Sequence, residues 1–191
     1  MKKNFYIKTV SFAIIIMIFI NITLIGSADK TVQDTNAKTL VKLGIMKGYE
    51  DGSLKLENKI KRSEFITLVV NLLGHDKDKD LNGITLKFKD ITKKHWAFNN
   101  IKLAIKHNLV SGYPDNTIGP DKNVTYAEAL AVVIRALGYE SSLKGKWPEN
   151  VINKAKELNL NKNIDIKASQ QLTRGNMSII VYNALTVRSN N

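Results

Sequence analysis

The sequence contains no cysteine, few prolines and aromatic residues, and fewer acidic than basic side chains. The absence of cysteine from its 191 residues excludes disulfides, zinc sites with thiolate ligands, cysteine nucleophiles and the lipid-modified cysteine of an exported lipoprotein. Folding must therefore depend on apolar burial, and an apolar fraction of 43% is sufficient for a packed core. The 17 acidic against 29 basic residues give a formal net charge of +12, which favours nucleic acid, an acidic membrane surface or an acidic polymer as partner.

The first 28 residues have the pattern of a secretory signal peptide. Three lysines precede an apolar stretch from Val10 to Ile25, and Gly26 and Ala28 are small enough for a signal peptidase site. We predict cleavage after Ala28, which removes three lysines and no acid, so that the mature chain from Asp29 keeps a net charge of +9. An exported protein does not normally meet nucleic acid. The alternative is an uncleaved membrane anchor, because the apolar stretch is long for a signal peptide.

The remainder of the chain is repetitive. Residues 36–74 align with residues 100–138 without a gap, and ten of these 39 positions are identical. A third, shorter copy follows, in which Trp147 corresponds to Trp96 and Leu172-Thr173 corresponds to Val124-Thr125. This copy has lost three residues and a turn. Repeats of this kind bury their apolar faces against one another.

Each copy has the pattern of a helix, a loop and a second helix. The first helix is amphipathic, because Ile101, Ala104 and Leu109 recur at helical spacing. The second helices are apolar on nearly every face and must be surrounded by other elements; they cover residues 65–73, 129–137 and 177–185. We therefore predict a mainly α fold in which three helix-loop-helix repeats form a pseudo-three-fold trimer around a central three-helix bundle.

The loops of the first two copies share a turn motif, in which glycine and asparagine accept positive φ and the tyrosine packs the loop. It comprises Gly48, Tyr49 and Asp51 in the first copy and Gly112, Tyr113 and Asp115 in the second.

These motifs resemble the S-layer homology (SLH) domains of bacterial cell-surface proteins. The similarity covers nearly the whole mature chain and is clearest in the second copy, in Phe88-Lys89-Asp90-Ile91, His95-Trp96-Ala97, Gly112-Tyr113-Pro114-Asp115 and Val124-Thr125-Tyr126-Ala127-Glu128. After the predicted signal peptide at 1–28, the resemblance implies a first repeat at 29–76 that is truncated at its N-terminal part, a linker at 77–87, a second repeat at 88–139 and a third at 140–188.

The resemblance also implies a function. SLH domains bind secondary cell-wall polysaccharide, often through a pyruvylated sugar, in grooves between neighbouring repeats. The chain is accordingly expected to be a secreted, non-enzymatic module of the cell wall or S-layer that has no cofactor and binds an anionic wall polysaccharide. One alternative is an SLH-like scaffold with degenerate glycan grooves that recruits another surface protein. The other is a membrane-tethered structural protein that keeps its N-terminal segment.

The family opens each central helix with an Ile-Thr-Arg-Ala-Glu segment, which no copy here matches fully. Threonine followed three residues later by glutamate is a capping box, so Thr125 and Glu128 are predicted to be structural. Glu64 and Thr173 each retain half of such a box, because their partner positions hold lysine and asparagine.

Arg62 and Arg174 lie in the first turn of a helix, where a cation opposes the helix dipole. A guanidinium beside exposed helix amides would suit a carboxylate, which a pyruvyl ketal supplies. The alternative is an ion pair with an acidic residue of a neighbouring unit; the resemblance favours glycan binding. Tyr126 replaces the arginine in the second copy, where it could stack on a sugar ring. Trp96 and Trp147 are either packing residues or walls of a sugar site.

The sequence has no recognisable metal-binding or catalytic motif. Residues 78–83 fit the first half of a calcium-binding EF-hand loop, but the position that requires a bidentate carboxylate is Lys89, so a solvated linker is the better interpretation. His75, His95 and His107 lack the spacing of zinc ligands. We find no nucleophile motif, phosphate-binding loop or paired carboxylates, and predict neither a metal site nor an enzyme.

Overall fold

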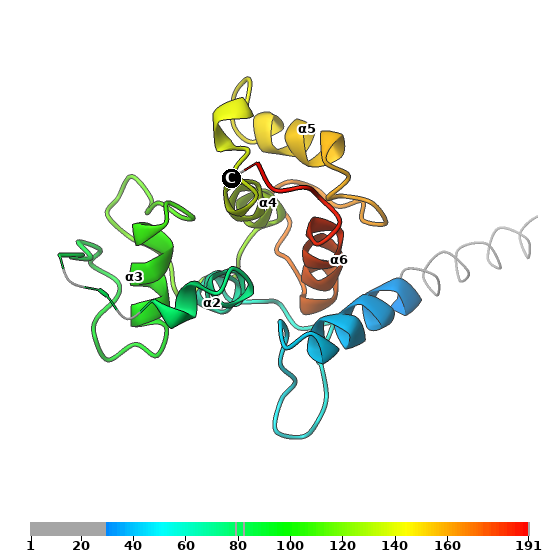
Figure 1. Cartoon of the computed structure of the whole chain (residues 1–191), viewed down its shortest axis with the longest axis horizontal. Helices are drawn as coiled ribbons and strands as arrows, with labels where there is room; N and C mark the ends of the chain where they lie inside the picture. The colour runs from blue at the N-terminus through cyan, green and yellow to red at the C-terminus, as the bar shows by residue number, and fades with distance from the viewer. Residues whose placement is uncertain (1–29, 79, 82, 191) are drawn as a thin grey trace, which may run out of the picture.

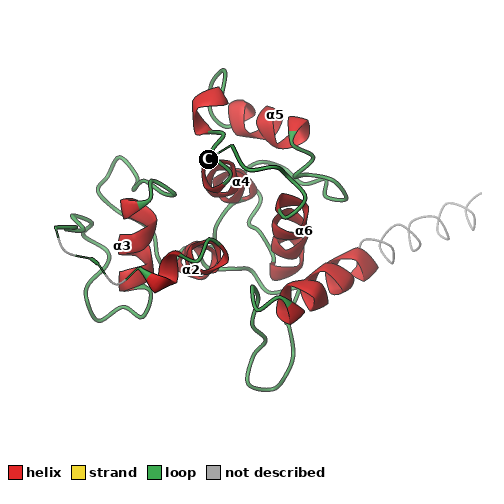
Figure 2. Cartoon of the chain, in the orientation of Figure 1, coloured by secondary structure: helices red, strands yellow, loops and turns green. Residues whose placement is uncertain are grey.

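The computed structural model describes residues 30–78, 80–81 and 83–190 (Figure 1). The predicted signal peptide and its cleavage site lie outside these residues. The described residues form helices, loops and isolated bridges, with no sheet, which confirms the predicted mainly α fold (Figure 2). Within these ranges, no helix has both the length and the apolar character needed to cross a membrane.

Helical residues 30–42 open the described chain. The elements that follow are α2 (Arg62–Leu72), the short 3-10 helix η1 (His75–Lys77), α3 (Phe98–Lys106), α4 (Tyr126–Ala136), the 3-10 helix η2 (Glu140–Ser142), α5 (Glu149–Glu157) and α6 (Arg174–Ala184). Each predicted repeat thus contains two long helices. The outer helices are residues 30–42, α3 and α5, and the inner helices are α2, α4 and α6 (Figure 1).

Each outer helix packs on the inner helix of another repeat. Helix α3 lies against α2 and α5 lies against α4, while residues 30–42 lie beside α6 (Figure 1). Gln33 Nε2 donates to Asn176 Oδ1 at 3.0 Å, and the Gln33 carbonyl accepts from Ser178 Oγ at 3.1 Å. The chain therefore closes on itself, because its first outer helix covers its last inner helix.

The segments that precede the three inner helices are joined through their backbones. Ile60 N donates to Leu172 O at 3.0 Å, Leu172 N donates to Val124 O at 2.9 Å, and Val124 N donates to Ile60 O at 3.1 Å. All three side chains are buried. Since each residue both donates and accepts, the bonds form a closed ring that holds the N-terminal ends of the inner helices together.

The C-terminal ends of the inner helices surround an apolar pocket of about 250 Å³, to which α2, α4 and α6 contribute Val69, Val133 and Val181. Helix α4 is the central element: every residue from 129 to 134 is buried, as expected for a helix that is apolar on all faces. It contacts both α2 and α6, whereas no Cα atoms of α2 and α6 lie within 8 Å of each other. The pseudo-three-fold symmetry of the bundle therefore stays a prediction.

Candidate functional site

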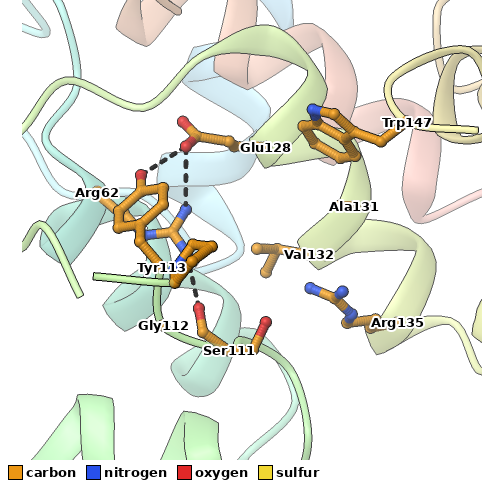
Figure 3. Close-up of a pocket in the computed structure, with 10 residues that line it drawn as sticks. Arg62, Ser111, Gly112, Tyr113, Glu128, Ala131, Val132, Arg135 and Trp147 are labelled. Carbon is orange, nitrogen blue, oxygen red and sulfur yellow. Dashed lines mark hydrogen bonds and ion pairs between the residues drawn. The ribbon is translucent and has the colours of Figure 1, made fainter. Parts of the chain in front are cut away.

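A pocket of about 350 Å³ lies where the three repeats meet (Figure 3). Arg62 reaches it from the start of α2 in the first repeat, and Tyr113 from the loop of the second. Arg135 comes from α4, and Trp147 from the segment before α5 in the third repeat. We call this pocket the Arg62 groove. An apolar face of α4 around Val132 completes its wall.

The loop of the second repeat is fixed by its own turn. Tyr113 N donates to Thr117 O at 2.7 Å, and Asp115 Oδ1 accepts from Thr117 N at 3.1 Å and from Thr117 Oγ1 at 2.6 Å. Gly112 is required because a Cβ there would lie 2.1 Å from the Phe88 ring and 2.8 Å from Thr117 O. This close packing holds Tyr113 at the edge of the groove.

The corresponding loop of the first repeat makes the same turn with fewer neighbours. Tyr49 N donates to Ser53 O at 2.9 Å, and Asp51 Oδ1 accepts from Ser53 N at 3.0 Å and from Ser53 Oγ at 2.6 Å. Hydrogen bonds from Ser53 lower the pKa of Asp51 to about 2. A Cβ at Gly48 would meet Ser53 O at 3.2 Å and no aromatic ring, because the first repeat has no counterpart of Phe88.

Arg62 binds the loop of the second repeat at both ends. Its Nε donates to Ile118 O at 3.0 Å and its Nη2 donates to Ser111 O at 3.3 Å, while its guanidinium lies 5.1 Å from the centre of the Tyr113 ring. Its Nη1 is 3.9 Å from Glu128 Oε1, and the residue is only 6% exposed. The carbonyls and the carboxylate therefore compensate a charge that the helix dipole disfavours.

Arg174 binds the loop of the first repeat in the same way. Its Nε donates to Leu54 O at 2.9 Å and its Nη2 donates to Lys47 O at 2.7 Å, and its guanidinium lies 5.0 Å from the centre of the Tyr49 ring. Arg174 is 8% exposed. In the described part of the chain it has no acidic partner within 4 Å, unlike Arg62.

Tyr126, at the equivalent position of α4, is buried, with 4% exposure, and does not line the Arg62 groove. Burial raises the pKa of its phenol to about 12. The third repeat lacks the turn that an arginine at this position would hold. The arginine therefore occurs at the starts of α2 and α6, where it binds a loop that contains the turn. It is absent from the start of α4, where the neighbouring repeat has no such turn.

Glu128 connects the groove to the start of α4. Its Oε1 accepts from Tyr113 Oη at 2.5 Å, and its Oε2 accepts from Thr125 N at 2.8 Å and from Thr125 Oγ1 at 2.9 Å. Burial raises the pKa of Glu128, but the hydrogen bonds from Tyr113 and Thr125 outweigh it, so the pKa lies below its usual value. Burial and the bond to Glu128 raise the pKa of Tyr113 to about 12. The carboxylate is therefore charged and fully engaged at neutral pH.

The three inner helices begin differently. Thr125 Oγ1 accepts from Glu128 N at 3.4 Å, which with the reverse bond makes both halves of a capping box at α4. At α2, Lys61 N donates to Glu64 Oε2 at 2.7 Å. At α6, Thr173 Oγ1 accepts from Asn176 N at 3.1 Å. Helix α4 thus has the complete capping box, α2 has only the glutamate half and α6 has only the threonine half.

Both tryptophans are exposed. Trp147 is 55% exposed and lines the Arg62 groove, whereas Trp96 is 61% exposed and does not. Trp96 stacks on His95, with 5.8 Å between ring centres. In the alignment of the repeats, Trp96 corresponds to Trp147, Tyr49 to Tyr113 and Arg174 to Arg62. Trp96, Tyr49 and Arg174 are therefore a second set of the residue types that line the Arg62 groove. From this register alone we predict that the second set forms an equivalent groove, and we call it the Arg174 groove.

Sequence reasoning missed Arg135, although the signal was present. It follows Glu128 by seven residues, at the spacing that places two residues on one face of a helix. Its Nε donates to Glu140 Oε1 at 2.7 Å.

The stacked rings of His75 and His107, with 3.6 Å between centres, were also missed. Among the residues that the structure describes, no cluster of histidine and carboxylate side chains could hold a metal ion.

The S-layer homology domain family model matches residues 35–66 and 87–130. Over 154 residues the chain is 36% identical to the middle cell wall protein of Brevibacillus brevis, a match that covers 81% of this chain and 14% of that protein. It is 34% identical over 163 residues to the surface layer protein of Brevibacillus choshinensis, covering 85% of this chain and 14% of the relative. A cellulosome-anchoring protein of Acetivibrio thermocellus is 40% identical over 92 residues, which are 48% of this chain and 21% of that protein.

The chain therefore spans only a small part of these relatives, 14% of the first two. The segments matched by the family model contain the loops held by Arg174 and Arg62 and the starts of α2 and α4. With the repeat motifs, the turn geometry and these relatives in agreement, the chain belongs to the S-layer homology domain family.

Proposed function

We propose that this chain attaches to the bacterial cell wall by binding an anionic secondary cell-wall polysaccharide, of which a pyruvylated sugar is one candidate. Its place at the cell wall or cell surface follows from its family and relatives. One observation carries the proposal: the Arg62 groove combines an exposed indole with two guanidinium groups where three repeats meet. Indole faces stack on sugar rings, and guanidinium forks bind carboxylates.

The charge of the chain supports the same ligand class. The net charge of +9 from Asp29 onward attracts an anionic polymer over distances of about 10 Å at moderate salt. Arg174 adds a buried guanidinium without an acidic partner within 4 Å among the described residues, an arrangement that an incoming anion would stabilise. Capture by the surface charge would precede binding in the grooves.

The relatives support an anchoring role rather than catalysis. One is named a cellulosome-anchoring protein, and the others are a middle cell wall protein and a surface layer protein. The described residues of the Arg62 groove include arginine, tyrosine and tryptophan, and in the Tyr113–Glu128 pair the phenol pKa is raised to about 12, which disfavours a nucleophilic phenolate. We therefore propose a non-enzymatic module that holds a protein at the wall.

Pelleting with isolated sacculi tests the proposal. The chain from Asp29 should sediment with intact sacculi and remain in solution with sacculi stripped of secondary polymer. Trp147→Ala and Trp96→Ala should each weaken binding about tenfold, because each removes an exposed stacking surface without opening the core. Equal pelleting on stripped sacculi would contradict the proposal.

Recruitment of a surface protein is the second candidate function. Leu43 is 58% exposed in the first repeat, which lacks the segment that carries Phe88 in the second. Val41, two residues earlier, is also 38% exposed, and neighbouring exposed apolar side chains favour contact with another protein more than a single one does. This function predicts that the tryptophan variants pellet as the wild type does, whereas Leu43→Lys loses a protein partner.

A further inference from the structure

We propose that Arg135, rather than Arg62, holds the acidic group of the ligand in the Arg62 groove, and that this group is a carboxylate. The inference rests on the glycan binding proposed above and names the residue that selects the acidic sugar. Its evidence is the way in which the two guanidinium groups of the groove are already engaged by the protein.

Arg62 has little capacity left for a ligand. Two of its three nitrogens donate to Ile118 O and Ser111 O, and the third faces Glu128 Oε1 at 3.9 Å. A ligand carboxylate at this nitrogen would lie close to a second negative charge, because the pKa of Glu128 is held below its usual value. Arg62 is therefore a positioning residue that fixes Tyr113 and its loop at the edge of the groove.

Arg135 is engaged at one nitrogen only. Its Nε donates to Glu140 Oε1 at 2.7 Å, and among the described residues neither Nη1 nor Nη2 has a hydrogen-bond acceptor. Glu140 has a side chain that is 53% exposed, so solvent and salt screen the pair and it adds little stability. The two terminal nitrogens are thus available for a bidentate bond to a carboxylate.

The position of Arg135 suits a sugar that stacks on Trp147. In Figure 3, Trp147 and Arg135 lie on one side of the pocket, with Val132 between them in height, and Arg62 and Tyr113 lie on the other side. Glu128 lies at the top of the view, at the end where Trp147 lies and away from Arg135. A ring on the indole can direct its acidic substituent to Arg135, which lies at the opposite end of the pocket in this view from the Glu128 carboxylate. The groove would take an acidic glycan, with the carboxylate at one end and the apolar face of the ring at the other.

The second groove provides an internal comparison. The repeat register places Asn71 where α4 has Arg135. An amide carries no charge, so the Arg174 groove has no guanidinium at this helix position, and its cations at the Tyr49 ring are Arg174 and Lys55, whose Nζ lies 4.2 Å from the ring centre. The two grooves should therefore differ in their dependence on this helix position, and Asn71→Arg places the missing cation in the second groove.

Three variants and two probes test the inference. Arg135→Gln removes the cation, Glu140→Gln breaks the same ion pair but keeps the cation, and Arg188→Gln makes an equal charge change at an exposed position outside the groove. The probes are intact sacculi and sacculi whose carboxylates have been reduced to alcohols. Dissociation constants come from pelleting at moderate salt, and circular dichroism checks that each variant is folded.

We expect Arg135→Gln to bind intact sacculi about tenfold more weakly than the wild type and to bind reduced sacculi equally well. Glu140→Gln and Arg188→Gln should bind intact sacculi at least as tightly as the wild type. Wild-type affinity of Arg135→Gln for intact sacculi would overturn the inference while leaving glycan binding intact. An equal loss in Glu140→Gln would also overturn it, since the ion pair would then be the cause. A wild-type chain that does not pellet with intact sacculi would overturn the proposed function instead.

Discussion

Arg62 and Arg174 show how a single residue can join two repeats. Each begins an inner helix, and each donates to two carbonyl oxygens of the loop in another repeat. From the sequence, the charge at this position predicted either a bound anion or a neighbouring acid. The structure adds the backbone of the loop as a third partner, which explains why the arginine and the loop occur together.

Tyr113 and Tyr126 link stability to alkaline pH. Burial raises the pKa of both phenols to about 12, while an unfolded chain ionises them near 10. The folded state therefore holds these protons more tightly, and the free energy of unfolding should fall as the pH rises from about 10 to 12, by about 1–3 kcal/mol per tyrosine. Urea unfolding at a series of pH values measures this slope.

Because lysines titrate in the same range, Tyr113→Phe and Tyr126→Phe serve as controls. Each should reduce the decrease in stability between pH 10 and 12 relative to the wild type. An identical pH dependence in both variants would show that other groups cause the loss.

At the scale of elements, the same turn motif occurs in two settings. In the second repeat the loop packs on Phe88, and Asp90 accepts hydrogen bonds from Ile118 N at 2.9 Å and Gly119 N at 2.8 Å. The first repeat has no such segment in its sequence. The loop of the second repeat is thus held from outside, whereas that of the first depends on its own turn and on Arg174.

This difference predicts unequal costs for the same substitution. Gly112→Ala places a methyl group against an aromatic ring and a backbone carbonyl, and should lower the free energy of unfolding by about 2 kcal/mol or more. Gly48→Ala meets its nearest atom at 3.2 Å and should cost less than about 1 kcal/mol. Urea denaturation of the two variants measures both values, and equal costs would show that Phe88 does not confine Gly112.

At the scale of the whole molecule, the repeats are not independent domains. Helices α3 and α5 cover the inner helices of the preceding repeats, and residues 30–42 cover α6. The ring of backbone bonds through Ile60, Val124 and Leu172 also requires all three repeats. Each repeat therefore completes its core only when the others are present.

Two fragments should consequently fold only together. A fragment of residues 29–86 lacks the partner of α2, and one of residues 87–191 leaves the face of α6 around Ser178 uncovered. We expect each to show little cooperative thermal unfolding by circular dichroism, and an equimolar mixture to recover it. Cooperative unfolding of the larger fragment alone at the temperature of the intact chain would contradict this prediction.

The sequence alone was sufficient to predict several features of the fold. The repeat register located the helices and the turns, and the threonine-glutamate spacing located Thr125 and Glu128 at the start of α4. Arg135 lies seven residues after Glu128 on one face of α4, but this spacing alone does not distinguish a groove residue from an ordinary cation near the end of a helix, so Arg135 was missed. The stacking of His75 on His107 joins residues 32 positions apart and has no local pattern.

Helix periodicity, capping and internal repetition are short-range properties, so the order of residues is enough to establish them along with the family. The partner of each helix is a long-range choice, and folding places α3 on α2 and residues 30–42 on α6 instead of pairing the two helices of one repeat. The same choice brings Arg62, Arg135 and Trp147 from three repeats into one pocket. These pairings are decided only in the folded chain. They depend on which apolar faces must still be buried, and which carbonyl oxygens still need a donor, when all the helices pack together.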